Sequence, residues 1–283
     1  MSDSDGKRLD KEQTMRLFLL RTGKVNKTTT GKKTRQIWLQ SVAVVAVLMM
    51  ITYFLFQPGN HQANEQLADI TVETPAGSPE EIYLPDGTQV WLNAASRLTY
   101  TQDFDVTERK VYLSGEGYFE VTRNEKLPFI VKTDELQVSV LGTKFNLKNY
   151  ADDGEATIYL LEGKVVIGNH VRQSEDIIME PEQKVFFDKK TGNTRLTQVT
   201  AGNSVEWTTG VLFFDEDLLP DIAKSLERSY DVKITVHPDL ANVRLYGSFS
   251  RKEQTVKDIL DILFSTGKIK YSITGNEIVL YPL

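Results

Sequence analysis

Two glutamates in the segment from Gly115 to Glu120 (GEGYFE) offer the paired carboxylates that glycoside hydrolysis uses. In the retaining mechanism the two carboxyl groups lie about 5–5.5 Å apart. The segment has the pattern of a β-strand, in which residues four apart share a face but lie about 13 Å apart along the backbone. Without special side-chain geometry this separation does not suit a retaining mechanism. We therefore predict that Glu116 and Glu120 are not catalytic.

Metal ligands and nucleophiles are sparse in the chain. It contains no cysteine, which excludes a disulfide, a thiolate zinc site and a cysteine nucleophile. The three histidines, His61, His170 and His237, are far apart in sequence and lack the spacing of metal ligands. We expect no catalytic residue, no metal and no cofactor, and a protein that is not an enzyme.

The charges of the chain are divided around one uncharged segment. The 283 residues carry a formal net charge of −6, which argues against a chain that binds nucleic acid directly. Residues 1–36 hold ten basic and four acidic side chains, a net charge of +6. Residues 57–283 hold 23 basic and 35 acidic side chains, a net charge of −12. Residues 37–56, between them, contain no charge, proline or glycine.

Residues 37–56 are predicted to form a transmembrane helix. Twenty helical residues are about 30 Å long, the thickness of the hydrocarbon core of a bilayer. Six Lys or Arg residues lie between Arg21 and Arg35, and none occurs from Gln36 until Arg97. The positive-inside rule therefore places residues 1–36 in the cytoplasm and the rest of the chain outside. A buried helix of a soluble protein and a cleaved signal peptide are the less favoured alternatives.

Residues 75–200 predict an all-β domain, which follows a polar tether over residues 57–74. Short alternating runs are separated by glycine and proline, and no stretch has a helical period. The turn Pro85-Asp86-Gly87-Thr88 is typical of a β-hairpin rather than of a calcium loop. The pattern is compatible with a sandwich, a roll or a solenoid and does not choose among them.

Residues 205–283 predict a small α+β domain after a polar linker at 198–204. Apolar residues four apart predict a helix over residues 216–230, with Asp215 placed to cap it. A second helix is predicted over residues 250–267, where Ser250 and Glu253 form a capping box. It is expected to bury Val256, Ile259, Leu260, Leu263 and Phe264. With strands at 211–214, 232–236, 243–248, 269–273 and 277–281, the order is βαββαββ, a small sheet with two helices packed on it.

Several segments of this predicted body resemble a known family in their order and spacing. The segments LPDGTQVWLNAASRLTY (84–100), RKVYLSGEGYFEV (109–121), LPFIVKT (127–133), VLGTKFNL (140–147) and LEGKVVI (161–167) resemble the periplasmic domain of FecR-type anti-sigma factors. The segments GVLFFDEDLLPDIAKSLERSYDV (210–232) and LYGSFS (245–250) resemble the small domain that follows it in FecR-like proteins of the Bacteroidetes. That domain is similar to the short N-terminal fold of secretins and TonB-dependent transporters.

The resemblance implies a single-span regulator of an extracytoplasmic-function (ECF) sigma factor. In such a protein the N-terminus is cytoplasmic, the span crosses the inner membrane and the C-terminus is periplasmic. The N-terminal signalling domain of an outer-membrane TonB-dependent transporter docks on the periplasmic part. Intramembrane or periplasmic proteases then cut within or near the span, which releases control of the sigma factor.

The segment before the span is the expected site of sigma-factor binding. Members of the family generally carry a longer cytoplasmic helical module, whereas 36 residues precede the span here. They allow one helix at about residues 9–21, in which Leu17, Phe18 and Leu20 are the predicted partner-binding residues. Burying each of these side chains contributes about 1.5–3 kcal/mol. A helix of this length is marginal in water, so we expect it to order on binding.

Two other functions are compatible with the sequence. In the first, the chain is a periplasmic structural or adaptor module of an envelope assembly, and its head serves only to set the topology. In the second, it is a membrane-tethered hydrolase or glycan binder that uses acidic residues and aromatic residues such as Trp91, Tyr118 and Trp207. Aromatic side chains of this kind more often fill a core.

Overall fold

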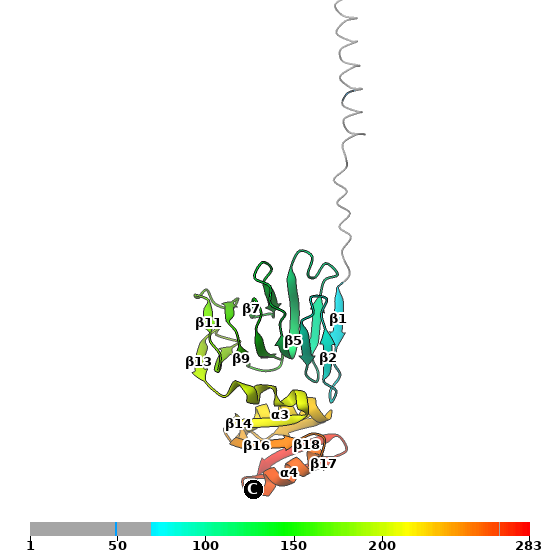
Figure 1. Cartoon of the computed structure of the whole chain (residues 1–283). Helices are drawn as coiled ribbons and strands as arrows, with labels where there is room; N and C mark the ends of the chain where they lie inside the picture. Colours follow the sequence, from blue (N-terminus) through cyan, green and yellow to red (C-terminus); the bar gives the residue numbers. More distant parts are fainter. Residues whose placement is uncertain (1–48, 50–68, 266) are drawn as a thin grey trace, which may run out of the picture. The chain divides into compact units, whose positions relative to one another are not determined.

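The computed structural model of the chain describes Met49, residues 69–265 and residues 267–283. The predicted cytoplasmic segment 1–36 lies outside the described residues, as does the predicted span apart from Met49. Among the described residues, no helix is both long enough and apolar enough to cross a membrane. Residues 66–283 cluster into one compact unit, whose strands and helices are labelled in Figure 1. The unit contains two separate hydrophobic cores.

The first part of this unit is a single sheet of thirteen strands, and no helix interrupts it. The all-β character that the sequence predicts for residues 75–200 is confirmed, but the sheet begins at Ile70, inside the segment that the sequence predicts as a tether. The strands are β1 (Ile70–Glu73), β2 (Glu80–Tyr83), β3 (Gln89–Leu92), β4 (Arg97–Tyr100), β5 (Arg109–Glu120), β6 (Phe129–Lys132), β7 (Leu136–Val140), β8 (Lys144–Asn149), β9 (Glu155–Glu162), β10 (Val165–Asn169), β11 (Ile177–Met179), β12 (Gln183–Asp188) and β13 (Thr194–Gln198).

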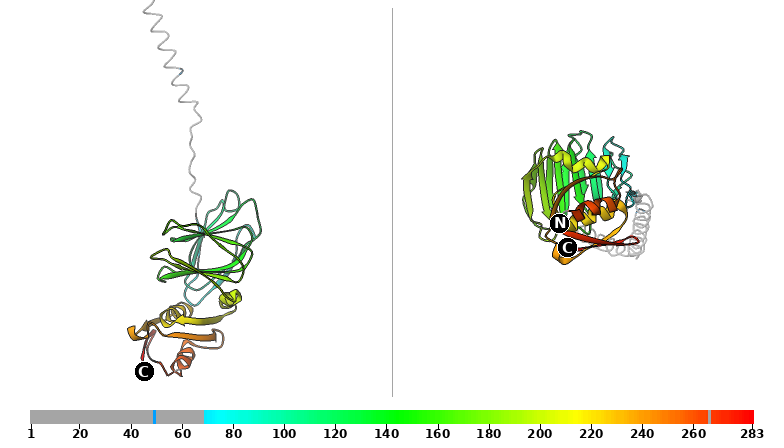
Figure 2. Two further views of the ribbon diagram at one scale, coloured as in Figure 1. Left: turned by 90° about the vertical axis from the view of Figure 1, so that its left-hand side faces the viewer. Right: turned by 90° about the horizontal axis from the view of Figure 1, so that it is seen from below.

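The sheet curls into two facing layers that share the long strand β5 (Figure 2). The first half of β5 pairs with β4 and β6, and this layer continues through β7 and β10 to β11, with β1 on its other edge. The second half of β5 pairs with β3 and β8, and this layer continues through β9 and β12 to β13, with β2 on its other edge. We call these the first and the second layer.

Gly115 lies where β5 passes from one layer to the other. Its φ angle is +117°, a backbone conformation that residues with a side chain rarely adopt. A Cβ atom there would lie 2.3 Å from Ser96 Oγ. The crossing therefore requires glycine at this position.

The facing surfaces of the two layers form the first core. Strand residues alternate between this core and the outside, so each inner row is apolar. Phe119 and Phe145 stack with their ring centroids 5.0 Å apart. The fully buried large side chains of this core are Leu92, Leu98, Phe119, Phe129, Leu136, Phe145, Leu147, Ile158, Leu160, Ile167 and Phe187.

The C-terminal elements have the predicted order βαββαββ and form the second core. Their strands, however, make two sheets rather than one: β14 pairs with β16, and β15, β18 and β17 form a three-stranded sheet. A 3₁₀ helix, η1, precedes them where the sequence predicts a linker. The elements are η1 (Ala201–Thr209), β14 (Val211–Leu218), α3 (Leu219–Tyr230), β15 (Lys233–Val236), η2 (Pro238–Leu240), β16 (Arg244–Ser250), α4 (Val256–Ser265), β17 (Ile269–Thr274) and β18 (Glu277–Pro282).

Both predicted helix starts are wrong by several residues. Helix α3 begins at Leu219 instead of residue 216, because Asp217 and Leu218 still pair with β16 beyond a bulge in β14, so Asp215 is not a cap. Helix α4 begins at Val256 instead of Ser250, because Ser250 pairs with Val211.

The start of α4 has a capping box of its own, which the sequence prediction missed. Thr255 Oγ1 accepts a hydrogen bond from the Asp258 N–H, and Asp258 Oδ2 accepts one from the Thr255 N–H. Of the five residues expected to be buried on α4, Ile259, Leu260 and Leu263 are buried, whereas Phe264 is 47% exposed.

Candidate functional site

The two glutamates weighed as a carboxylate pair, Glu116 and Glu120, do not share hydrogen-bond partners. Glu116 is buried and Glu120 is half-buried, and each carboxylate is bound by different neighbours. Lys144 Nζ lies 3.2 Å from Glu120, and the Tyr118 hydroxyl donates a 2.9 Å hydrogen bond to it. Among the described residues no group of His, Asp and Glu side chains could hold a metal ion. The predicted partner-binding residues Leu17, Phe18 and Leu20 lie outside the described residues.

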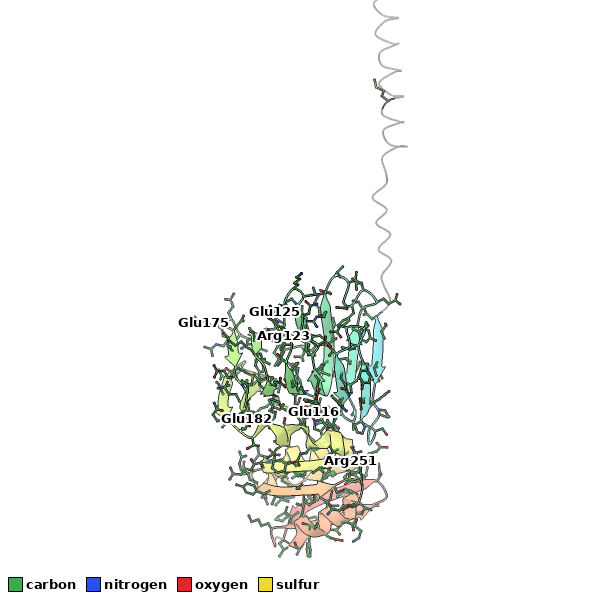
Figure 3. The ribbon with its side chains drawn as sticks, viewed as in Figure 1. Glu116, Arg123, Glu125, Glu175, Glu182 and Arg251 are labelled. Atoms are coloured by element: carbon green, nitrogen blue, oxygen red, sulfur yellow. The ribbon has the colours of Figure 1, made fainter. Side chains whose placement is uncertain are left out.

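The polar side chains that the structure does bring together lie at the junction between the two cores. Trp207 of η1 donates from Nε1 to Asn146 Oδ1 on the second layer, at 3.3 Å. Asn146 in turn donates to Glu116 Oε1 at 2.8 Å, and Asn93 donates to Glu116 Oε2 at 2.9 Å. Figure 3 labels Glu116 where the strands approach η1. The buried carboxylate is therefore part of a hydrogen-bonded chain that anchors η1 to the second layer.

Arg228, in the last turn of α3, contacts several groups across this junction. Its guanidinium Nη2 lies 2.6 Å from Asp153 Oδ1 and 2.7 Å from Asp152 Oδ1, both in the loop between β8 and β9. The guanidinium carbon lies 3.7 Å from the centre of the Tyr150 ring. Lys224, one turn earlier on α3, places Nζ 3.3 Å from Asp153 Oδ1. Helix α3 is thus tied to the β8–β9 loop by charge, hydrogen bonding and a cation–π contact.

The pKa shifts at the junction follow from these contacts. Burial alone would raise the pKa of Asp153, but the hydrogen bonds from Arg228 and the charges of Lys148, Arg228 and Lys224 outweigh it and hold this pKa below its ordinary value. Burial strongly raises the pKa of the Tyr150 hydroxyl, which donates a 2.9 Å hydrogen bond to the Ala94 carbonyl. The junction therefore keeps its carboxylate charged and its phenol neutral.

A half-buried lysine lies on the same outer surface of the second layer. Lys184 Nζ is 3.9 Å from the centre of the Phe186 ring and 4.6 Å from that of Tyr159. Burial lowers the pKa of Lys184 to about 8. Burial also raises the pKa of Asp217 on β14, although the charges of Lys148 and Lys184 partly offset this. Both groups are therefore desolvated at the junction.

The loop after β1 is also held by the C-terminal elements. The Gly77 N–H donates a 2.8 Å hydrogen bond to the Arg228 carbonyl, and Arg251 Nη2 donates a 2.6 Å hydrogen bond to the Gly77 carbonyl. Residue 77 has a φ angle of +76°, which suits glycine. The second core therefore contacts two loops of the thirteen-stranded sheet, the loop after β1 and the β8–β9 loop.

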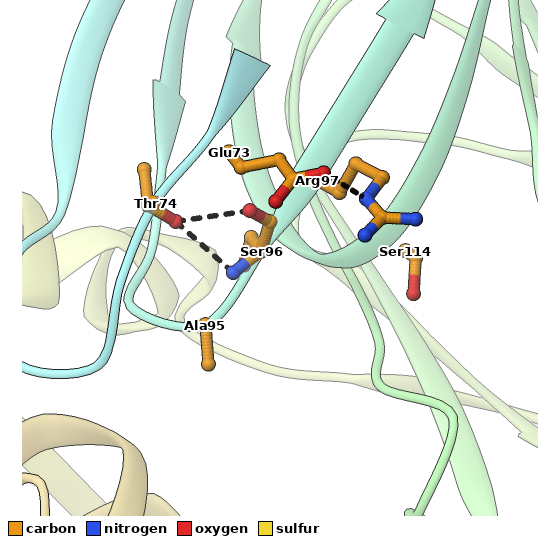
Figure 4. Close-up of a pocket in the computed structure, with 6 residues that line it drawn as sticks. All are labelled: Glu73, Thr74, Ala95, Ser96, Arg97 and Ser114. Atoms are coloured by element: carbon orange, nitrogen blue, oxygen red, sulfur yellow. Dashed lines mark hydrogen bonds and ion pairs between the residues drawn. The ribbon is translucent and has the colours of Figure 1, made fainter. Parts of the chain in front are cut away.

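An open polar hollow of about 270 Å³ lies beside this loop (Figure 4). An ion pair between Glu73 and Arg97, with Oε1 and Nε 2.8 Å apart, crosses its rim. Thr74 Oγ1 accepts a 3.0 Å hydrogen bond from the Ser96 N–H. These polar groups are paired with one another by the ion pair and the hydrogen bond. The hollow therefore lies on the outer side of the contact between β1 and β4. Its lining residues are Glu73, Thr74, Ala95, Ser96, Arg97 and Ser114.

Sequence reasoning missed the junction residues for identifiable reasons. Arg228 lies on the polar side of an amphipathic helix, where an arginine ordinarily faces water. Asp152 and Asp153 precede a glycine, a pattern typical of an exposed turn. The only local signal was the concentration of charge in the last turn of α3, and it does not identify a partner.

Family models match both parts of the compact unit. The model described as "FecR protein" matches residues 70–166, and the model described as "FecR, C-terminal" matches residues 211–280. Together they cover most of the thirteen-stranded sheet and nearly all of the second core.

Two solved structures are similar to the chain. They are crystal structures, at 2.50 and 1.65 Å resolution, of a "putative anti-sigma factor from Parabacteroides distasonis ATCC 8503". Each has a TM-score of 0.70 and 29% sequence identity, and covers 76% of this chain. The match includes 100% of one solved chain and 99% of the other. No curated protein matches the chain.

Proposed function

The chain belongs to the FecR family of anti-sigma factors, and on this premise we propose that it relays a signal from an outer-membrane TonB-dependent transporter to a cytoplasmic ECF sigma factor. The observation that carries the proposal is the junction: α3 of the second core is tied through Arg228 to two loops of the thirteen-stranded sheet. A ligand that moves the second core acts on these loops directly. The protein serves as a binding and regulatory protein, not as an enzyme.

The proposed topology has one span in the inner membrane. Residues 1–36 are cytoplasmic, residues 37–56 cross the membrane and the compact unit is periplasmic. The steep change from a net charge of +6 before the span to −12 after it supports this orientation. Alkaline phosphatase, which is active only outside the cytoplasm, should be active when fused after Asn60 and inactive when fused after Lys27. The reverse pattern would refute the topology.

The proposed output is the binding of residues 1–36 to the sigma factor, with Leu17, Phe18 and Leu20 as the apolar anchors. Replacing all three with serine should abolish co-purification of the sigma factor and change transcription from its promoters. Replacing the polar residues Thr28, Thr29 and Thr30 with serine is the matched control and should change neither. If the chain captures the sigma factor equally well after the apolar replacements, this output is wrong.

The proposed input is pairing of the transporter's signalling domain with an exposed strand edge of the second core. Strand β17 lies at the edge of its three-stranded sheet, and Lys270, Ser272 and Thr274 along it are exposed. A strand edge with unpaired backbone groups can accept a further strand from a partner.

The absence of cysteine makes this input testable by cross-linking. A single Ser272→Cys substitution introduces one thiol on β17, and Thr194→Cys introduces one on β13, an exposed edge strand of the other core. A thiol-directed photo-cross-linker should join the transporter's signalling domain to the first variant and not to the second. Equal labelling of both, or of neither, would contradict docking at β17.

Proteolysis within or near the span is the proposed final step, detectable as a shortened chain after the transporter binds its substrate.

A further inference from the structure

Strand β1 is a short edge strand of the first layer. It has four residues, pairs only with β4 and leaves Ile70, Thr71 and Glu73 exposed. Its ion pair with Arg97 joins side chains that are 58% and 61% exposed, and such pairs contribute only about 0–1 kcal/mol. The strand therefore has little burial of its own to hold it in place.

The loop that follows β1 supplies the firmer attachment. Thr74 is buried, donates a hydrogen bond from Oγ1 to the Asn93 carbonyl at 2.5 Å, and accepts one from the Ser96 N–H. Three residues later the backbone of Gly77 is bound on both its N–H and its carbonyl by the second core, as described above. The hydrogen bonds that fix the C-terminal end of this segment thus come from Arg228 and Arg251, which belong to the second core.

The same turn of α3 is fixed by the β8–β9 loop. The Arg228 carbonyl accepts from Gly77, while its guanidinium binds Asp152 and Asp153. A shift of α3 away from the β8–β9 loop therefore also withdraws the acceptor of the Gly77 N–H. One displacement of the second core breaks both attachments.

We infer that residues 70–78, which we call the β1 segment, form a detachable strand whose release is controlled by the position of α3 and Arg251. Release frees nine residues, which span about 30 Å when extended. This length is added between the predicted span and β2, and the edge of β4 that pairs with β1 is uncovered. The inference deepens the proposed function and rests on it for its setting, because it supplies the step by which a ligand on the second core changes the chain next to the membrane.

Hydrogen–deuterium exchange of the full-length chain in detergent micelles tests this inference. The amides of Thr74 and Gly77 are both hydrogen-bonded and report the attachment. Arg251→Gln should raise their exchange rates at least tenfold and leave the amides of β5 and β8 unchanged. Arg244→Gln is the matched control, since Arg244 is an exposed arginine of the same core that binds the Glu216 carbonyl.

Two results would overturn the inference. One is an unchanged rate for the β1 segment in Arg251→Gln, and the other is an equal rise in the β1 segment and β5, which indicates general destabilisation. Asp153→Asn weakens the hold on α3 from the other side and should raise exchange in the same segment. If both variants fail to fold, hydrogen–deuterium exchange of the unaltered chain tests the inference. The free energy of opening of the β1 segment must then be lower than that of β4 and β5, and equal free energies would refute detachment.

A cross-strand disulfide provides the converse test. Thr71 and Thr99 are paired residues of β1 and β4, and the chain has no other thiol. In the oxidised Thr71→Cys/Thr99→Cys chain, Arg251→Gln should no longer raise exchange at Thr74. Because these measurements contain neither the sigma factor nor the transporter, their failure would refute the detachable segment without bearing on the proposed relay. Failure of the cross-linking or co-purification experiments would refute the relay and leave detachment standing.

Discussion

Arg228 Nη2 and Asp153 Oδ1 lie 2.6 Å apart across the junction of the two cores, and both side chains are only 11% exposed. Ion pairs this well shielded are costly to break, because removing one partner leaves the other charge buried. The contact therefore makes the junction sensitive to single substitutions, and it can be measured against a surface pair of the same chain.

A double-mutant cycle on Arg228 and Asp153 should give a coupling energy of about 1.5–3 kcal/mol, since charge-assisted hydrogen bonds contribute that much. The matched pair is Lys257 and Asp261 on α4, whose Nζ and Oδ2 atoms are 2.7 Å apart but whose side chains are 63% and 50% exposed. Its cycle should give about 0.3–0.5 kcal/mol. Urea unfolding of residues 66–283 measures both. Equal coupling in the two cycles would show that the junction pair is not shielded from solvent in solution.

Arg109→Met should lower the free energy of unfolding by about 3–5 kcal/mol, because it strands the carboxylate of Asp86 in the interior. The Arg109 side chain is fully buried, its Nη1 lies 3.0 Å from Asp86 Oδ2, and it also donates to backbone carbonyls within residues 122–127. Arg123→Met is the control: that side chain is 74% exposed, so the change should stay within about 0.5 kcal/mol. Chemical denaturation distinguishes the two outcomes, and a small effect at Arg109 would contradict the buried pair.

Gly115→Ala should cost more than about 2 kcal/mol of stability, whereas Gly154→Ala should cost less than about 0.5 kcal/mol. At Gly115 the added Cβ atom meets Ser96 at 2.3 Å in a left-handed conformation; at Gly154 no atom lies within 4 Å. Thermal melting of the two variants makes the comparison. Similar melting temperatures would mean that the crossing of β5 does not depend on glycine.

Stability should rise with pH above pH 8 because of Lys184. Burial lowers its pKa to about 8 in the folded chain, from 10.5 ordinarily, so between these values the unfolded chain binds more protons and the folded state gains. Between pH 8 and 9.5 we expect the free energy of unfolding to rise by about 1 kcal/mol from this group. Denaturant titrations of the unaltered chain and of Lys184→Met should differ by this rise. A parallel pH profile in the two proteins would show that Lys184 is hydrated.

Above pH 10 the trend should reverse. Burial raises the pKa of the Tyr118, Tyr150 and Tyr159 hydroxyls above their ordinary value. The unfolded chain then releases protons that the folded chain keeps, so stability falls as pH rises further. Tyr150→Phe should reduce this fall, and measurement of unfolding at pH 10 and 11 in both proteins detects the difference.

The helices and strands were predictable where a local sequence pattern is compatible with only one type of secondary structure. Alternation and turn chemistry indicated the strands of residues 75–200, and the apolar residues four apart from Leu218 to Tyr230 indicated α3, although not its first residue. The capping signals at residues 250–258 were ambiguous, because both Ser250 and Thr255 precede an acidic residue by three positions. Only the pairing of Ser250 with Val211, far away in sequence, decides between them.

The junction was not predictable by the same means. Arg228 and Asp153 are 75 residues apart, and each has the local pattern of a solvent-exposed residue. Their burial arises from the docking of one core on the other, a property of the tertiary fold. The resemblance to FecR-type proteins identified the two parts of the chain but carried no information about which side chains join them.

The sharing of β5 by both layers has a consequence for how the thirteen-stranded sheet melts. A layer that shares no strand with another layer can unfold independently. Here the unfolding of either layer removes hydrogen-bond partners from β5, which belongs to both. The two layers therefore form one cooperative folding unit. Calorimetry should record a single transition for this sheet, with a van't Hoff enthalpy equal to the calorimetric one.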